Sequence, residues 1–304
     1  MEQIKEEINR ANPAIKESSL ITYARILNII YNRTNEHGEP ADYKYFEDNK
    51  QKIYKYLEGV KSLKYRKTML AALINIVRDP DIRAEYKTTM LDQWREANEE
   101  DSKQTKSDKQ SENWISMEEV KNIYTNLKID AAPLFKRKSL TRQEHNRLIS
   151  FIILSLYVLL PPRRSTDYTE MLMLGEKPTS EKEQVNYIDG RDMVFNVYKT
   201  AKHYGVQKVR MPNTLIQILK QWQKMFPHNR YLLFDFCGKK LSNVYITHYL
   251  NKIFGKKISV NMLRHIYISE KVLAGVPKLT ELQKEAHDMG HSVAQQTLYK
   301  KFDP

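Results

Sequence analysis

The chain has 304 residues, with 50 Lys and Arg against 37 Asp and Glu, and its formal net charge of +13 favours a polyanionic partner. Hydrophobic residues make up 41% of it, enough for ordinary cores, but no apolar run reaches the roughly 20 residues that a membrane span requires. The one cysteine, Cys237, excludes an internal disulfide and a cysteine-based zinc site. The first residues lack the apolar segment of a signal peptide, so we expect an intracellular protein.

Residues 1–94 are predicted to form a small helical bundle. Segment 19–33 has apolar residues at helical spacing, and segments 46–60 and 62–79 repeat the pattern. The apolar stripe of segment 19–33 consists of Leu20, Tyr23, Ile26, Leu27 and Ile30. Basic residues on the outer faces either form a solvated surface or face phosphates, and the net positive charge favours phosphates. The candidates for phosphate contact are Lys50, Lys52, Lys64, Arg66 and Lys67, with Lys55 and Lys61 beside them.

Segment 95–113 is polar, nearly free of apolar residues and without periodicity, which is typical of a linker between domains. Ordered structure is expected again from residue 114. Ser116 with Glu119, and Thr141 with Glu144, have the spacing of capping boxes and predict two helix starts. The second of these helices is strongly apolar, and two prolines end it, so we expect it to be buried on most sides.

Apolar residues alternate in segments 193–200 and 206–212, which predicts a β-hairpin with residues 201–205 between its strands. Lys199 is then expected at the end of the first strand and Lys202 near the tip. Helical spacing returns in the segments 213–226, 242–255, 261–275, 279–291 and 292–302. The expected fold class is mainly α, with a small β-hairpin or sheet.

Two adjacent arginines, Arg163 and Arg164, follow the apolar helix in a short polar turn. Arginine offers a planar fork of donors that suits phosphate oxygens, and Asp167 is placed to orient the guanidinium of Arg164. A pair of arginines in a loop is most often ordinary surface. The hairpin lysines Lys199 and Lys202 have the chemistry to protonate a leaving oxygen, but they equally serve to keep a sheet edge soluble.

A second group of candidates lies toward the end of the chain. Arg264 and His265 are predicted near the start of a helix, where a lone histidine is more often structural than catalytic. His291 follows a glycine that favours a tight turn, and precedes a serine able to cap the next helix. Tyr299 falls about two turns into that helix. Arginines, a lysine, a histidine and a tyrosine together form a set able to attack a phosphodiester without a metal or cofactor.

The closing stretch MGHSVAQQTLY, residues 289–299, is similar to the Leu-Gly-His-Ser motif and terminal tyrosine of the tyrosine recombinases, the phage integrase family. The chain resembles in particular the members carried by large eukaryotic DNA viruses and mobile elements. The resemblance spans nearly the whole chain. It implies a helical core-binding domain at 1–94, a linker at 95–113 and a catalytic domain of the DNA breaking and rejoining type at 114–304.

The resemblance also assigns roles to single residues. Arg164 matches the first arginine of the family's Arg-x-x-Glu pattern, with Asp167 in place of the glutamate, and Arg163 is the alternative. Asn261 replaces the first histidine of the His-x-x-Arg-His motif and is unable to accept a proton at neutral pH. The implied catalytic residues are Arg164, Lys199, Arg264, His291 and Tyr299, with Lys202, Arg163, His265 and Asn261 as further candidates. His203 joins the basic residues of the first domain as a candidate for DNA contact.

The activity implied by the resemblance is site-specific DNA recombination or integration through a 3′-phosphotyrosyl intermediate. The expected partner is double-stranded DNA, bound by a protein that is monomeric in solution and tetrameric on paired sites. We expect it in the nucleus or in a viral replication compartment of a host cell. Two alternatives stay open. One is a type IB topoisomerase, and the other is a DNA-binding protein of the same fold with impaired cleavage, which Asn261 and the short spacing from His291 to Tyr299 motivate.

Overall fold

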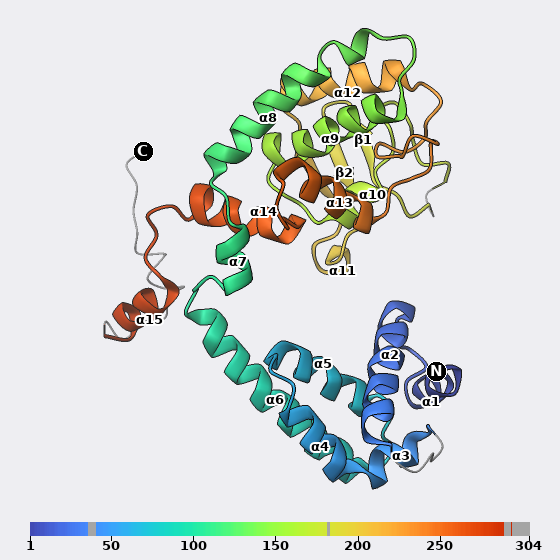
Figure 1. Cartoon of the computed structure of the whole chain (residues 1–304), viewed down its shortest axis with the longest axis vertical. Helices are drawn as coiled ribbons and strands as arrows, with labels where there is room; N and C mark the ends of the chain where they lie inside the picture. Colours follow the sequence, from blue (N-terminus) through green and yellow to red (C-terminus); the bar gives the residue numbers. More distant parts are fainter. Residues whose placement is uncertain (36–40, 181–182, 289–292, 294–304) are drawn as a thin grey trace. The chain divides into compact units, whose positions relative to one another are not determined.

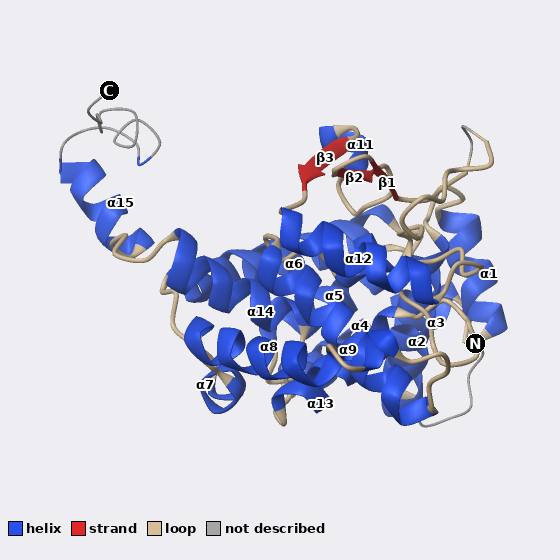
Figure 2. Ribbon diagram, turned by 90° about the horizontal axis from the view of Figure 1, so that it is seen from above, coloured by secondary structure: helices blue, strands red, loops and turns tan. Residues whose placement is uncertain are grey.

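A computed structural model describes residues 1–35, 41–180, 183–288 and Val293. The described part is mainly helical and has one small antiparallel sheet, which confirms the predicted fold class (Figure 1). Helices dominate the view in Figure 2, where the strands form a single patch. The chain divides into two compact units. The first unit comprises Met1–Thr105 and the described residues from Pro277 onward, and the second is Lys106–Val276.

The first unit is a helical bundle around one apolar core. Ile26, Leu27 and Ile30 are buried in this core and Leu20 and Tyr23 pack against it, so the predicted stripe is confirmed. Its helices are α1 (Glu2–Ala11), α2 (Glu17–Thr34), α3 (Tyr43–Asp48), α4 (Lys50–Glu58), α5 (Leu63–Ile74), α6 (Pro80–Ser102) and α15 (Leu279–Asp288).

The long helix α6 enters the segment 95–113 that the sequence marks as a linker. Asp79 caps its first turn and Pro80 occupies the position where a missing N–H costs nothing. Only Tyr86 and Ala97 of this helix are buried, so its exposed surface needs no apolar stripe. A helix of this kind leaves little periodicity in the sequence, which is why the segment reads as a linker. The boundary between the two units falls after Thr105, inside the same segment.

The second unit is built around α9 (Arg142–Leu159), which is buried along most of its length as predicted. Both expected capping boxes are present, Ser116 with Glu119 and Thr141 with Glu144. The other helices are α7 (Asp108–Asn113), α8 (Met117–Ala131), η1 (Leu134–Lys136), α10 (Ser165–Thr169), α11 (Ala201–Tyr204), α12 (Asn213–Met225), α13 (Asn243–Phe254), α14 (Val260–Tyr267) and η2 (Ile268–Val272).

The sheet has three antiparallel strands in the order β1 (Tyr187–Asp189), β2 (Asp192–Phe195) and β3 (Gln207–Arg210). The predicted hairpin is therefore present, but β2 ends at Phe195 and not at Thr200. The cause is Asn186, whose side-chain oxygen accepts hydrogen bonds from the backbone N–H groups of Asn196 and Val197. These two residues therefore do not continue the strand ladder. Lys199 consequently lies beyond the strand, and Lys202 lies in the short helix α11.

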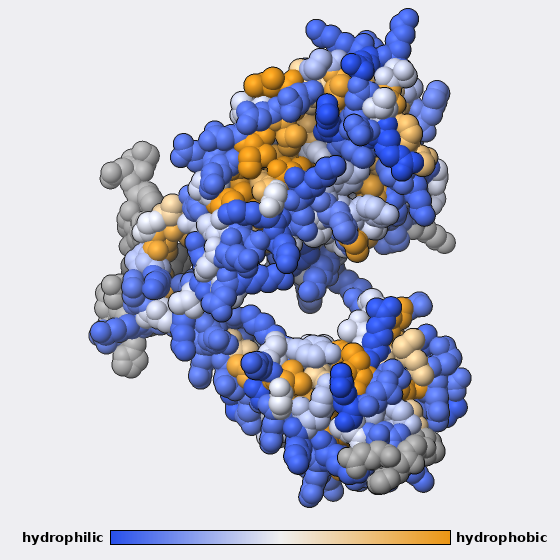
Figure 3. All heavy atoms as spheres, in the orientation of Figure 1, coloured by the Kyte–Doolittle hydropathy of each residue, from blue (hydrophilic) through white to orange (hydrophobic). Residues whose placement is uncertain are grey.

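The surface in view in Figure 3 is mainly hydrophilic. The most exposed apolar side chains of the second unit include Tyr204 and Val206, at 69% and 61% exposure, in the connection between β2 and β3. Within the described ranges, none of the helices has both the length and the apolar character needed to cross a membrane. The last predicted helix, 292–302, lies outside the described residues apart from Val293.

Candidate functional site

The arginine turn follows directly from the way in which α9 ends. Leu160 is extended and is followed by two prolines, which cannot continue the helix. Arg163 and Arg164 come next, and Arg164 holds the N-cap position of α10. Both arginine side chains are half-buried. The sequence therefore places two guanidinium groups at the junction between a buried helix and the next one.

Asp167 pairs with Arg163 and not with Arg164, which corrects the sequence-based expectation. The Nε atom of Arg163 donates to Asp167 Oδ2 over 2.9 Å, and the two side chains are 18% and 3% exposed. Arg164 contacts Asp167 through its backbone, because its carbonyl accepts the Asp167 N–H at the start of α10. Among the described residues, no hydrogen bond or ion pair holds the Arg164 guanidinium. The described residues therefore leave its side-chain donors available to a ligand.

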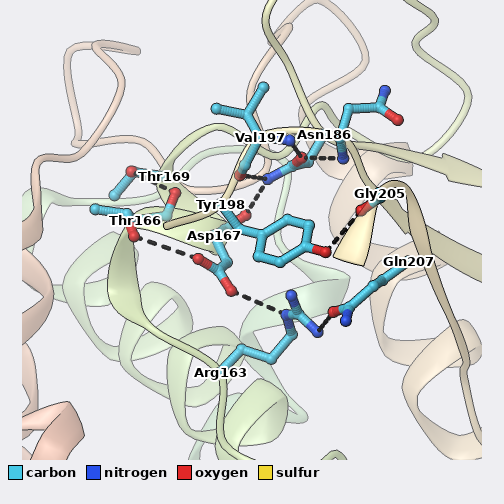
Figure 4. A network of polar contacts seen from close by, with 10 residues as sticks. Arg163, Thr166, Asp167, Thr169, Asn186, Val197, Tyr198, Gly205 and Gln207 are labelled. Carbon is cyan, nitrogen blue, oxygen red and sulfur yellow. Dashed lines mark hydrogen bonds and ion pairs between the residues drawn. The ribbon is translucent and has the colours of Figure 1, made fainter. Parts of the chain in front are cut away.

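The Arg163 guanidinium is fixed on its other sides by the sheet (Figure 4). Its Nη1 atom donates to Gln207 Oε1 of β3 over 2.9 Å. Its central carbon lies 3.9 Å from the ring centroid of Phe195 and 5.2 Å from that of Tyr198. The Tyr198 hydroxyl in turn donates to the Gly205 carbonyl over 2.6 Å. The Arg163 side chain thus links the arginine turn to both ends of the connection between β2 and β3.

Asn186 makes the second tie between these segments. Its Nδ2 atom donates to the Asp167 carbonyl over 2.7 Å and to the Val197 carbonyl over 3.0 Å. Its Oδ1 atom accepts from the backbone N–H groups of Asn196 and Val197, each over 2.8 Å. The residue is fully buried, and all of its amide bonding capacity serves this junction. Nothing in the spacing of the sequence singles Asn186 out.

The basic residues of the β2–β3 connection are presented outward from this fixed base. Lys199, Lys202 and His203 are all exposed. In the part of the chain that the structure describes, none of the three side chains has a hydrogen bond or ion pair. The connection therefore offers its positive groups to solvent or to a partner while Tyr198 and Gly205 hold its ends together.

Arg264 shares the electrostatic environment of the arginine turn. It lies on α14 and is half-buried. Burial raises the pKa of the Tyr157 phenol well above its ordinary value; Tyr168 and Asp167 raise it further, and Arg264 opposes them. Burial also raises the pKa of Asp167, against the charges of Arg163 and Arg164. The charge of Arg264 therefore acts on the buried Tyr157 phenol, the charge of Arg164 acts on the Asp167 carboxyl, and these two groups also interact with each other.

The remaining catalytic candidates divide between the described and undescribed parts of the chain. His265 and Asn261 lie on α14 and are exposed. His291 and Tyr299 lie outside the described residues.

The segment that follows Arg264 is held in place by Glu270, which accepts from Trp114 Nε1 over 2.9 Å and from the Met117 backbone over 2.7 Å. Sequence reasoning missed Glu270, because its two partners are distant in the chain.

The basic candidates of the first unit are partly occupied by acidic groups of α6. Lys50 contacts Glu85 and Lys64 contacts Asp101, each over 2.6 Å. The hydrogen bond to Glu85 raises the pKa of Lys50. Such exposed pairs contribute little to stability. The role of Lys50 and Lys64 in DNA contact stays a prediction.

The other three candidates on this unit differ from one another. Lys52 is exposed on α4. Lys67 is half-buried and lies 5.8 Å from the ring centroid of Trp94, whereas Arg66 buries its Nε atom without a hydrogen-bond partner among the described residues.

Comparisons with known proteins add a likeness to a solved structure. No protein-family model matches the chain, and no curated protein matches its sequence. The chain is similar to a crystal structure of XerA recombinase, with 12% sequence identity and a TM-score of 0.36. The alignment covers 99% of this chain and 94% of that chain. A likeness at this level establishes neither a shared fold nor a shared activity.

Proposed function

We propose that the protein is a tyrosine recombinase that cleaves and rejoins double-stranded DNA through a 3′-phosphotyrosyl intermediate. The observation that carries the proposal is the junction of the arginine turn with the β2–β3 connection through Arg163 and Asn186. This junction joins the turn that carries Arg164, the buried carboxylate of Asp167 and the connection that carries Lys199 and Lys202. The closing sequence around His291 and Tyr299 supplies the histidine and nucleophile that this chemistry needs.

In the proposed reaction, the Tyr299 phenol gives its proton to His291 as its oxygen attacks the scissile phosphorus, and the bond from phosphorus to the 5′ oxygen breaks. Arg164 and Arg264 neutralise the charge that develops on the phosphate oxygens. Lys199 or Lys202 gives its proton to the departing 5′ oxygen. A 5′-hydroxyl from a second DNA reverses these steps and frees the tyrosine. The proposed working assembly is a homotetramer on paired DNA sites, formed from monomers.

Arg163 takes a different role in this scheme from Arg164. Two of its donors are already used by Asp167 and Gln207, and its face is covered by Phe195. It is therefore suited to positioning the β2–β3 connection. Arg164, with no hydrogen bond or ion pair to the described residues, is suited to contacting the phosphate.

The test is covalent trapping on a suicide DNA substrate that carries a nick beside the scissile phosphate. The wild-type protein is expected to form a denaturant-resistant complex with DNA, and Tyr299→Phe is expected to form none. Tyr267→Phe is a matched control, because it removes a phenol that lies on α14 outside the proposed set. Absence of trapping by the wild type, or equal trapping by Tyr299→Phe, contradicts the proposal.

One observation favours a second function, that of a DNA-binding protein with impaired cleavage. Asn261 stands on α14 where the resemblance calls for a histidine, and its amide cannot accept a proton at neutral pH. That function predicts tight binding to the same substrate with no covalent product from any variant.

A further inference from the structure

The first unit contains a pocket lined by arginines, none of which is among the residues assigned to DNA cleavage. It lies at the end of α1 and beside the turn that joins α5 to α6. The volume of this pocket is about 380 Å³, and its lining consists of Arg10, Ala11, Val77, Arg78 and Arg83. Three of these five lining residues are arginines, a composition that is suited to an anion.

A buried carboxylate holds two of the three guanidinium groups. Glu7 has a side chain only 8% exposed; it accepts from Arg10 Nη1 over 2.9 Å and from Arg78 Nη2 over 2.5 Å. Each arginine uses one terminal nitrogen in this way, and a guanidinium has five N–H donors. The Glu7 carboxylate therefore fixes both guanidinium groups but leaves most of their N–H donors without a bond to it. Glu6, whose carboxylate lies 3.7 Å from Arg10 Nη2, is exposed.

The lining of the pocket is rigid at its other positions. The guanidinium carbon of Arg78 lies 3.8 Å from the ring centroid of Tyr43. The backbone N–H groups of Arg78 and Asp79 donate to one oxygen of Glu47, over 2.7 and 2.8 Å. Arg83 donates its Nε to the Ile74 carbonyl over 3.0 Å, and no described residue pairs with its terminal nitrogens.

We infer that this pocket is a binding site for a single phosphate group. The residues that line the pocket include three arginines and no carboxylate, while Glu6, Glu7 and Glu47 contact two of these arginines. A phosphate carries more negative charge than a carboxylate and has three terminal oxygens, so it is able to use donors from all three arginines. Because Glu7, Tyr43 and Ile74 already immobilise these side chains, little rotamer entropy is lost when the phosphate binds.

Isothermal titration of the full-length protein with inorganic phosphate at low ionic strength tests the site. The wild type is expected to bind, and Arg83→Gln and Arg10→Gln are each expected to weaken binding by about tenfold or more, since each loses a charged hydrogen bond. Arg25→Gln, an exposed substitution on α2 with the same charge change, is the control and is expected to bind as the wild type does. Arg10 is 64% exposed, so its replacement leaves the core intact even if Arg83→Gln unfolds.

No phosphate binding by the wild type, or an equal loss in Arg25→Gln, overturns the inference. Two DNA duplexes of one sequence, with a 5′-phosphate or a 5′-hydroxyl end, then identify the source of the group. Tighter binding of the phosphorylated end that disappears in Arg83→Gln indicates a terminal phosphate. Equal weakening of both duplexes by Arg83→Gln, with a shallower salt dependence, indicates a phosphate of the DNA backbone. Covalent trapping is measured separately, so a protein that binds phosphate but never traps DNA keeps this site and loses the proposed recombinase activity.

Discussion

His145 is a buried histidine whose neutral form is required by the folded state. It lies in the first turns of α9, is 1% exposed, and neither ring nitrogen has a hydrogen-bond partner among the described residues. Four aromatic rings surround it at centroid distances of 5.4 to 5.9 Å, those of Trp222, Phe226, Phe234 and Phe236. Burial lowers the pKa of His145 from 6.5 to about 4, and the nearby charge of Asp235 opposes this only in part.

The sign of the pH effect follows from which state binds the proton. Between pH 6.5 and about 4 the unfolded chain protonates this histidine and the folded protein does not. The free energy of unfolding therefore decreases as the pH falls through this range. At 1.36 kcal/mol for each pH unit, the loss that His145 contributes is about 3 kcal/mol when the pH reaches 4. Replacing His145 with Phe keeps an aromatic ring among the four surrounding rings and removes the titrating group.

Urea unfolding at several pH values between 7 and 4 measures this difference. A Trp94→Phe background leaves Trp114 and Trp222 as the fluorophores, and both belong to the second unit. His145→Phe is expected to flatten the pH dependence by about 3 kcal/mol relative to the parent. His228→Phe, which replaces an exposed histidine, is expected to leave it unchanged. Parallel pH profiles of His145→Phe and the parent protein would refute the assigned role of burial.

Three further predictions concern the junction at the candidate site. Asn186→Ala removes four hydrogen bonds from a fully buried position, so we expect its free energy of unfolding to fall by about 3 kcal/mol or more. We also expect trypsin to cut faster after Lys199 in this variant, and an unchanged digestion rate contradicts this. Asp167→Asn leaves the half-buried Arg163 without a charged partner, and urea unfolding is expected to show a loss of about 2 kcal/mol. Arg164→Ala breaks no hydrogen bond or ion pair of its side chain to the described residues, so its stability is expected to stay within about 0.5 kcal/mol of the wild type. Its rate of covalent trapping, in contrast, is expected to fall by about 10²–10³-fold, and equal trapping rates contradict a phosphate contact.

The elements that local sequence determines were predictable. The capping boxes at Ser116 and Thr141 depend on residues three apart, and the structure confirms both. The stripe of α2 and the apolar character of α9 follow from spacing alone. The polar helix α6 was not recognised as a helix, because a helix that is exposed on most sides needs no apolar pattern.

Features that depend on tertiary contacts were not predictable. The end of β2 is decided by the amide of Asn186, which comes from a different segment. The partner of Asp167 is decided by the extended backbone at Arg164, which lets Arg163 reach the carboxylate. The sequence placed Arg163, Arg164 and Arg264 in the right elements, but it contained no signal for Asn186 or Glu270. The geometry around His291 and Tyr299 stays a prediction.

Mapping the protein–DNA bond tests the proposed chemistry most directly. The complex trapped on the nicked suicide substrate is digested with nuclease and protease, and the modified peptide is sequenced by mass spectrometry. We expect one residual nucleotide attached through its 3′-phosphate to Tyr299. Attachment to any other residue, or a complex that dissociates fully in denaturant, would contradict the recombinase proposal.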